Sequence, residues 1–236
     1  MDTLYIVMPA YNEEANIEAV IADWYPVLQG KSEFSRLVVA DSGSTDSTHS
    51  LLLTLMGQYP LLRVISNTQK QHGPKVIALY RYAIEKGADY IFQTDSDGQT
   101  SPEEFDSFWQ DRASYDAILG NRCRRGDGVS RAIVERIVCL MLRLYFGVIV
   151  PDANAPFRLM KAEALVRYLP RFPEDYFLPN IMLTTYFAYY QHPITFREIS
   201  FRPRQGGKNS IHLAKIFSIG WQAQKDFRRF KREMNE

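Results

Sequence analysis

Cysteine is scarce in this chain of 236 residues, which contains only Cys123 and Cys139. Their separation matches no metal-ligand spacing and nothing indicates a secretory context, so we expect two reduced thiols without a catalytic role. The sequence begins MDTLYIVMPAYNEE, where no cationic region precedes a long apolar stretch, and it therefore predicts no signal peptide. These absences favour a cytoplasmic protein.

Long hydrophobic runs are also missing. The longest apolar run, residues 137–150 (IVCLMLRLYFGVIV), is too short to cross a bilayer and carries Arg143 in its middle. It is typical of a buried helix, and a helix that lies in a membrane interface would have the same composition.

Charge of one sign is not in excess, because 28 Lys and Arg residues face 27 Asp and Glu residues, a formal net charge of +1. This balance argues against a dedicated nucleic-acid-binding protein, and we expect no nucleic-acid partner. A content of 46% hydrophobic and 23% charged residues is that of one ordinary globular domain, and no linker-like segment divides the chain.

Strand-like and helix-like segments alternate through the first half. Leu4 begins a compact β-rich run over 4–8, and an amphipathic pattern typical of a helix follows it. The same order recurs twice, which predicts an α/β fold with one mostly parallel, Rossmann-like sheet and helices on both faces. We expect strands at 4–8, 36–40, 62–66, 90–94, 116–119, 157–160 and, at an edge, 194–201, and later helices at 130–146, 163–168, 181–190 and 211–236.

Polar clusters follow three of these strands: residues 9–14 (PAYNEE), 41–48 (DSGSTDST) and 95–99 (DSDGQ). Ligands of such sheets bind outside the carboxyl ends of the strands, so we expect the three clusters to converge on one edge. Each cluster also has a purely structural interpretation, because Asp, Ser and Glu are common at helix N-termini.

The 95–99 cluster places two carboxylates and an amide oxygen on a tight turn, the hard oxygen ligands that Mg²⁺ or Mn²⁺ prefers. The alternative is a turn that caps a helix starting near Pro102, with Ser101 as the N-cap and Glu104 as its capping-box partner. Both interpretations can hold together.

Taken in this order and spacing, the three clusters resemble the motifs of the family-2 inverting glycosyltransferases of GT-A fold, over nearly the whole chain. The polyprenyl-phosphate sugar transferase branch, of the dolichol-phosphate mannosyltransferase type, is the most similar. P-x-Y-N-E corresponds to Pro9–Glu13, D-D-G-S-x-D-x-T to Asp41–Thr48, and D-x-D-x-Q to Asp95–Gln99 with Pro102-Glu103 after it. Further matches are Gly120-Asn121-Arg122, Arg131, Asp152, Pro156-Phe157-Arg158-Leu159 and Gly206-Gly207-Lys208-Asn209-Ser210.

The resemblance implies a nucleotide-diphosphate sugar donor of UDP or GDP type, bound by residues 1–100, and an acceptor half over 101–210. It implies donor contacts from Pro9, Ala10, Tyr11, Glu13, Asp41, Gly43, Ser44, Asp95 and Ser96, and metal ligation of Mg²⁺ or Mn²⁺ by Asp97 and Gln99. It implies that Arg122, Arg131 and Lys208 meet the phosphate of a lipid-linked acceptor, and that Arg158 and Lys208 meet the diphosphate or the acceptor. It also implies that Asp97, Asp152, Arg158 and Lys208 form the catalytic set. Arg and Lys suit these roles because they neutralise phosphate.

Two positions depart from the family pattern. Ser42 replaces the second Asp of the D-D-G-S motif, and Glu135 stands four residues after Arg131, where the polyprenyl-phosphate branch tends to have a small hydroxyl residue. A carboxylate near an acceptor phosphate would repel it, so either Glu135 turns away or the acceptor differs.

The resemblance favours inverting transfer of a sugar to polyprenyl phosphate, which is already anionic and needs no general base. A sugar hydroxyl as acceptor would need a carboxylate base, for which Asp152, Glu174 and Asp175 are candidates, although Glu174 and Asp175 are more typical of solvated loop charges. A non-catalytic nucleotide-sugar-binding subunit is the third alternative.

The tail, residues 211–236, predicts a basic amphipathic helix. Apolar residues including Phe227 and Phe230 recur at helical spacing, and Lys225, Arg228 and Arg232 lie on its polar side. Such a helix can dock on anionic lipid, or it can pack on the domain through the same apolar stripe. With a lipid-linked acceptor, we expect this helix to hold the protein peripherally on the inner face of a membrane.

Overall fold

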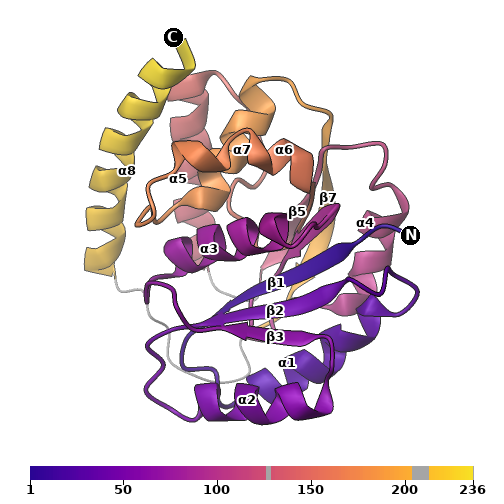
Figure 1. The fold of residues 1–236 in the computed structure, drawn as a ribbon. Helices are drawn as coiled ribbons and strands as arrows, with labels where there is room; N and C mark the ends of the chain where they lie inside the picture. Colours follow the sequence, from indigo (N-terminus) through magenta and orange to yellow (C-terminus); the bar gives the residue numbers. More distant parts are fainter. Residues whose placement is uncertain (126–128, 204–212, 236) are drawn as a thin grey trace.

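A central β-sheet carries helices on both of its faces in the computed structural model, which describes residues 1–125, 129–203 and 213–235 (Figure 1). Within these residues the sheet has seven strands in the order β3-β2-β1-β4-β6-β5-β7. The predicted α/β class with a single sheet is therefore confirmed.

The first half supplies four parallel strands and the helices that connect them. β1 pairs with β2 on one side and with β4 on the other, and β3 pairs with β2. The elements are β1 (Leu4–Ala10), α1 (Ile17–Trp24), η1 (Tyr25–Leu28), β2 (Arg36–Asp41), α2 (Thr48–Gln58), β3 (Leu62–Ile65), α3 (His72–Glu85) and β4 (Tyr90–Gln93).

The second half extends the same sheet. β6 runs antiparallel to both β4 and β5, so β5 points in the same direction as β4, and β7 lies parallel to β5 at the edge, as predicted. The elements are η2 (Pro102–Glu104), α4 (Phe105–Gln110), β5 (Ala117–Arg125), α5 (Val129–Phe146), β6 (Arg158–Lys161), α6 (Ala162–Val166), η3 (Leu169–Arg171), α7 (Pro179–Tyr189), β7 (Ile194–Phe201) and α8 (Leu213–Asn235).

Each face of the sheet buries its own core, because successive side chains of a strand point to opposite faces. In β1, Ile6 and Met8 join the core beneath α1, α2 and α4, whereas Tyr5 and Val7 join the core beneath α3 and α5–α8. Both cores therefore position the strand ends between two layers of helices (Figure 1).

The predicted capping box at Ser101 and Glu104 is wrong. Ser101 makes no side-chain cap, and Pro102–Glu104 forms a 3₁₀ turn. Glu104 Oε1 instead accepts hydrogen bonds from the backbone N–H and the hydroxyl of Ser200, at 2.8 and 2.7 Å. The carboxylate thus ties this turn to β7, a partner 96 residues away in the sequence.

The apolar stripe of α8 packs on the domain over the part whose side chains are described. Phe227 contacts Tyr145 and Phe146 of α5, with ring centroids 6.0 and 5.6 Å apart, and Phe230 contacts Phe172 and Tyr176. Ala223, Phe227, Phe230 and Met234 are all buried. Between residues 223 and 234 the tail is therefore a packed surface helix, and its apolar side is not available to lipid.

Candidate active site

The three polar clusters meet at the carboxyl ends of β1, β2 and β4, three adjacent strands of the sheet. The 9–14 and 41–48 clusters interlock: Asn12 N–H donates to Ser44 Oγ (3.0 Å), and Glu13 N–H donates to Thr48 Oγ1 (2.7 Å). The 95–99 cluster joins them because Ser96 Oγ donates to the Pro9 carbonyl (2.8 Å). The predicted convergence is confirmed.

Asp41 lies at the end of β2 as a buried carboxylate. It accepts a hydrogen bond from Ser44 Oγ (2.5 Å), and its other oxygen lies 3.0 Å from His49 Nδ1. Gly43 adopts φ +76°, and a Cβ there would lie 3.3 Å from side-chain carbons of Lys70. Glycine therefore suits this left-handed backbone, and a Cβ here would also require the Lys70 side chain to shift.

Ser42, the first departure from the family pattern, has a structural role here. Its hydroxyl donates to the Ser66 carbonyl (2.6 Å) and lies 2.8 Å from Thr68 Oγ1. These bonds join the end of β2 to the segment after β3. Ser42 thereby fixes the loop that carries Lys70.

Lys75 is a site residue that the sequence analysis missed. It lies on α3, only 1% exposed, and its Nζ donates to the Ala10 carbonyl at 2.5 Å. Burial lowers the pKa of Lys75 to about 8, with the charge of Asp41 opposing this shift and that of Lys70 adding to it. Lys75 and Lys70 both lie over the ring of Tyr11, 5.4 and 4.7 Å from its centroid. The signal in the sequence that could have identified Lys75 is its position between Pro74 and Val76, on an otherwise apolar face of the helix.

Asp95 and Asp97 lie on the loop after β4, where they could hold a divalent cation. The Asp95 side chain is 23% exposed, and one of its oxygens lies 3.3 Å from His72 Nε2. Asp97 Oδ1 accepts from the Gln99 N–H at 3.2 Å. Among the described residues no group of three His, Cys, Asp or Glu side chains could hold a metal. The donors present fit a Mg²⁺-type ion that takes one or two carboxylates from the protein and its other oxygens from a diphosphate.

Gln99 is buried, and its side-chain amide is already engaged. Gln99 Nε2 donates to the Arg202 carbonyl at 2.7 Å, and Arg202 N–H donates back to the Gln99 carbonyl at 2.8 Å. The pair joins the 95–99 cluster to the end of β7. In this geometry Gln99 could offer a metal only its amide oxygen.

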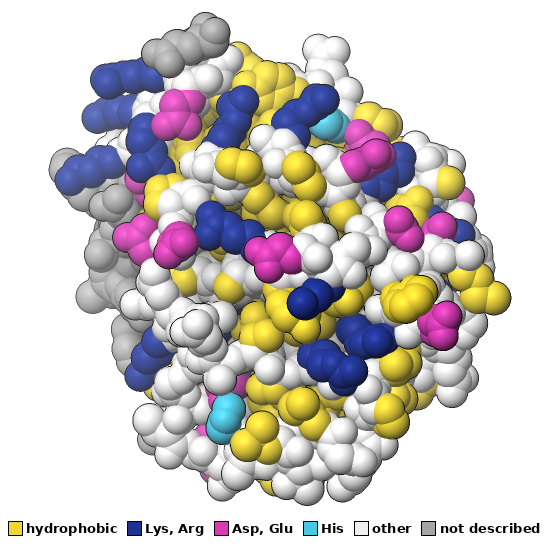
Figure 2. Space-filling view, in the orientation of Figure 1, with side chains coloured by type: hydrophobic (Ala, Val, Ile, Leu, Met, Phe, Trp, Pro, Cys, Tyr) yellow, Lys and Arg dark blue, Asp and Glu magenta, His cyan; other side chains and the backbone are white. Residues whose placement is uncertain are grey.

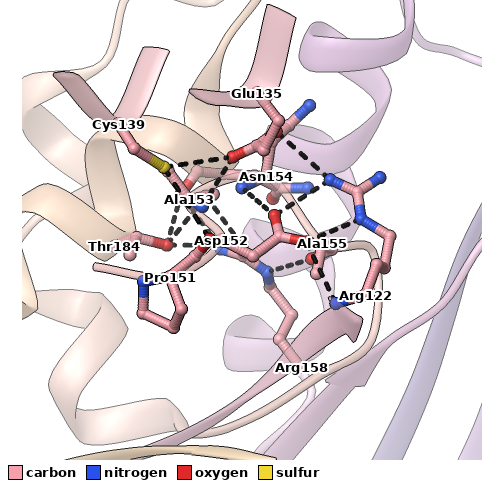
Figure 3. A network of polar contacts seen from close by, with 11 residues as sticks. Arg122, Glu135, Cys139, Pro151, Asp152, Ala153, Asn154, Ala155, Arg158 and Thr184 are labelled. Carbon is pink, nitrogen blue, oxygen red and sulfur yellow. Dashed lines mark hydrogen bonds and ion pairs between the residues drawn. The ribbon is translucent and has the colours of Figure 1, made fainter. Parts of the chain in front are cut away.

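Arg122 lies at the same edge of the sheet, because β5 points in the direction of β4. Its guanidinium forms a bidentate pair with Asp152, at 2.7 Å from Nε and 2.9 Å from Nη2, and Nη2 also donates to Glu135 at 3.2 Å (Figure 3). The predicted phosphate-binding arginine is thus already paired with two carboxylates. Glu135, the second departure, turns inward.

The two carboxyl groups on Arg122 are shifted in opposite directions. Burial alone would raise the pKa of Asp152, but the hydrogen bonds and the charge of Arg122 outweigh it and lower that pKa. Burial, and next the negative charge of Asp152, raise the pKa of Glu135 against the charge of Arg122. Asp152 is therefore the ionised partner of Arg122, and its lowered pKa and its engaged oxygens make it a weak general base.

Arg158 does not point into an open site, contrary to the prediction that it meets the diphosphate or the acceptor. It is 1% exposed and donates to the carbonyls of Ala155 (3.1 Å), Asn180 (3.1 Å) and Ala153 (3.3 Å). The guanidinium thus fixes the segment that carries Asp152. This arginine is a positioning residue.

The remaining predicted residues are distributed as follows. Arg131 is partly exposed in the first turns of α5, and Lys208 lies outside the described residues, with the rest of 206–210. Glu174 is an exposed loop charge 3.5 Å from Arg81, and Asp175 is exposed as well. Pro9, Ala10, Tyr11, Glu13, Asp41, Gly43, Ser44, Asp95 and Ser96 all lie in the three converging segments.

α5 carries an exposed apolar stripe. Ile133, Ile137, Leu140 and Leu144 recur at helical spacing and are 51%, 53%, 55% and 74% exposed. Arg136 and Arg143 are exposed on the same helix. In the described part of the chain, no helix combines the length and the apolar character that spanning a membrane requires.

Polar loops from adjacent parallel strands that meet at one edge are the arrangement of the ligand-binding edge in open α/β proteins. Within this class, the chain belongs to glycosyl transferase family 2, whose description its residues 5–169 match. The predicted GT-A fold is confirmed with it.

Two curated relatives share part of the sequence. An undecaprenyl-phosphate mannosyltransferase from Micrococcus luteus is 26% identical over 165 residues, 67% of this chain and 66% of the relative. An undecaprenyl-phosphate 4-deoxy-4-formamido-L-arabinose transferase from Pseudomonas paraeruginosa is 24% identical over 180 residues, 76% of this chain and 53% of the relative. The aligned part of this chain thus spans between about half and two thirds of these relatives.

Solved structures share the fold. A glucosyl-3-phosphoglycerate synthase from Mycobacterium tuberculosis, in complex with Mn²⁺ and UDP-glucose, superposes with a TM-score of 0.66 at 22% identity and covers 94% of this chain and 76% of that one. TarS from S. aureus superposes with a TM-score of 0.58 at 17% identity, covering 85% and 60%.

Proposed function

We propose that this chain transfers a sugar, with inversion, from a nucleotide-diphosphate sugar to polyprenyl phosphate at the cytoplasmic face of a membrane. The observation that carries the proposal is that one sheet edge combines the three polar strand ends with Arg122, next to a helix that exposes an apolar stripe. A donor site and a lipid-facing helix are what such a reaction requires. The names of the two undecaprenyl-phosphate relatives support the choice of acceptor.

On the donor side, Tyr11 and Asp41 would hold the base and the ribose, and the cationic Lys75 would offset the charge of the diphosphate. Asp95 and Asp97 would hold Mg²⁺ or Mn²⁺, which, when bound, supplies positive charge to the departing diphosphate. The neighbour solved with Mn²⁺ and UDP-glucose supports a UDP-type donor.

In the transfer step, an oxygen of the acceptor phosphate would attack the anomeric carbon from the side opposite the diphosphate. A new carbon–oxygen bond forms, and the diphosphate leaves with the electron pair of the bond that breaks. The attacking phosphate is already anionic at neutral pH, so no general base is needed. Arg122 and Arg131 would orient it through charge-assisted hydrogen bonds.

The membrane surface would be contacted mainly by α5. Its apolar stripe suits insertion among lipid chains, and Arg136 and Arg143 suit anionic headgroups. α8 would add charge alone, because its described apolar side is buried; Lys and Arg side chains gather along it at the upper left of Figure 2. This assignment moves the predicted membrane contact from the tail to α5.

The test is transfer of labelled sugar from UDP-glucose or GDP-mannose to undecaprenyl phosphate in anionic vesicles with Mn²⁺. We expect labelled lipid with the wild type and with Asp106→Ala, an exposed control on α4, and none with a folded Asp97→Ala variant. Labelled product on a soluble sugar acceptor without lipid would favour a hydroxyl acceptor instead. Donor binding without any transfer would favour a non-catalytic subunit.

A further inference from the structure

The carboxylate of Glu135 bridges two donors of the acceptor half. Its Oε2 accepts from Arg122 Nη2 at 3.2 Å, and its Oε1 accepts from the backbone N–H of Ala153 at 2.8 Å (Figure 3). Glu135 is 9% exposed, and it reaches these donors from α5, whereas Arg122 belongs to β5 and Ala153 to the segment before β6. A guanidinium N–H and a main-chain N–H thus form a small anion site, and Glu135 fills it.

Asp152 has a different place on the same arginine. Its two carboxylate oxygens accept hydrogen bonds from Nε and Nη2 of Arg122 in a bidentate pair. It also accepts from the backbone N–H groups of Arg122 (3.3 Å) and Asn154 (3.0 Å). Five N–H groups of a guanidinium can serve more than one anion. Asp152 therefore holds the arginine in place, and Glu135 makes the longer, weaker contact, which can be exchanged while Arg122 stays fixed.

The burial of Glu135 beside a second carboxylate offsets part of the electrostatic cost of moving it out of this site. Its carboxylate is buried beside the like charge of Asp152, with Arg122 as a shared cation and the Cys139 thiol 3.7 Å away. Two carboxylates on one buried guanidinium leave an excess negative charge, which disfavours the ionised form of Glu135. A side chain at 135 lies one helical turn from the partly exposed Arg131, so a rotated carboxylate regains both water and a nearby cation.

We propose that Glu135 is an internal stand-in for the acceptor phosphate, which displaces it from Arg122 Nη2 and Ala153 N–H when the acceptor binds. The inference rests on the proposed function and deepens it. An entering phosphate monoester brings up to two charges and three acceptor oxygens against one carboxylate, so it can compete for these donors. An uncharged acceptor gains nothing from the exchange. Glu135 would thus be a specificity-determining residue: phosphate-bearing acceptors can displace it, but they bind more weakly than they would without this competition.

The experiment is steady-state transfer to geranyl phosphate, a prenyl phosphate of short chain, by the wild type and Glu135→Gln. Glutamine can still accept from Ala153 N–H but carries no competing charge. We expect the KM for geranyl phosphate to fall about five- to tenfold, which is about 1 to 1.4 kcal/mol, with kcat within about twofold and the donor KM unchanged. Glu163→Gln, an exposed control on α6, should match the wild type.

Each alternative result overturns a defined statement. Transfer with an unchanged acceptor KM in Glu135→Gln overturns the inference and leaves the proposed function intact. A rise in the KM of both substrates, with a lower melting temperature, assigns Glu135 a purely structural role and also overturns it. Absence of transfer to any prenyl phosphate by the wild type, with donor binding retained, overturns the proposed function and the inference with it.

Discussion

We predict that Lys75 makes the binding of a nucleoside diphosphate sensitive to pH. In the free protein the pKa of Lys75 is lowered to about 8, mainly because the side chain is buried. In the proposed complex, a bound diphosphate would add negative charge at the same strand ends and would raise that pKa again. Binding is therefore favoured where Lys75 is protonated, and it weakens as the pH rises through 8, because the nucleotide must then bring a proton with it.

The magnitude follows from the pKa values of the free and bound states. Free Lys75 is about nine-tenths protonated at pH 7 and about one-tenth protonated at pH 9. If its pKa in the complex returns to near the ordinary value of 10.5, the affinity for the nucleotide falls about tenfold between these pH values, or ~1.4 kcal/mol. At pH 8 binding takes up about half a proton per nucleotide.

Titration calorimetry with UDP and with GDP, at pH 7, 8 and 9 in two buffers of different ionisation enthalpy, measures both quantities. The phosphate groups of the nucleotide are largely ionised across this range and contribute little. Lys75→Arg keeps a cation that does not titrate, so its affinity should stay flat and its proton uptake should vanish. A flat wild-type profile, or the same slope in Lys75→Arg, would refute the reasoning.

Three further predictions concern other parts of the molecule. Arg158→Met should lower the free energy of unfolding in urea by about 3 kcal/mol, because buried carbonyls lose their donors; superimposable unfolding curves would contradict this. Leu144→Glu, at a 74% exposed position, should change stability by less than about 0.5 kcal/mol yet weaken cosedimentation with anionic vesicles several-fold, and undiminished sedimentation would exclude α5 as the lipid contact. A nucleoside diphosphate at 100 times its Kd should stabilise the wild type by about 2.7 kcal/mol. Asp97→Ala should abolish the part of this thermal stabilisation that depends on Mn²⁺. An undiminished Mn²⁺ effect in the variant would show that Asp97 is not a metal ligand.

The sheet and its order of elements could be predicted because the signals are local. Hydrophobic runs and the polar clusters after them follow one another along the chain, and the strand ends then converge by topology alone. β5 was predicted to end at 119 but continues to Arg125. The hydrogen bonds between β5 and β7 use backbone groups, so polar side chains beyond Gly120 do not end the strand. The predicted capping box is wrong because the partner of Glu104 is not local: its carboxylate accepts from Ser200, 96 residues away in the sequence.

The amphipathic pattern of the tail predicts a helix but not the surface that covers its apolar side. A stripe of Phe227 and Phe230 needs cover, but the pattern does not say whether lipid or protein supplies it. In the fold, Phe146 and Phe172 would themselves be uncovered without α8, so the two surfaces bury each other. In α5 the inward side joins the core, whereas the stripe from Ile133 to Leu144 stays exposed in the described part of the chain.

Arg122 and Arg158 have different surroundings in the fold, which the sequence alone does not distinguish. Arg122 and Arg158 both follow from family motifs as phosphate ligands, and both types of side chain suit phosphate. In the fold, Arg158 lies deep in the core and donates to three backbone carbonyls and to the Thr184 hydroxyl. Arg122 meets two carboxylates at a sheet edge instead, one held tightly and one by a single longer bond. Of these two arrangements, only the second leaves a position that an incoming phosphate could take. We therefore assign the proposed acceptor contact to Arg122 and Glu135, and to Arg158 the positioning of the segment that carries Asp152.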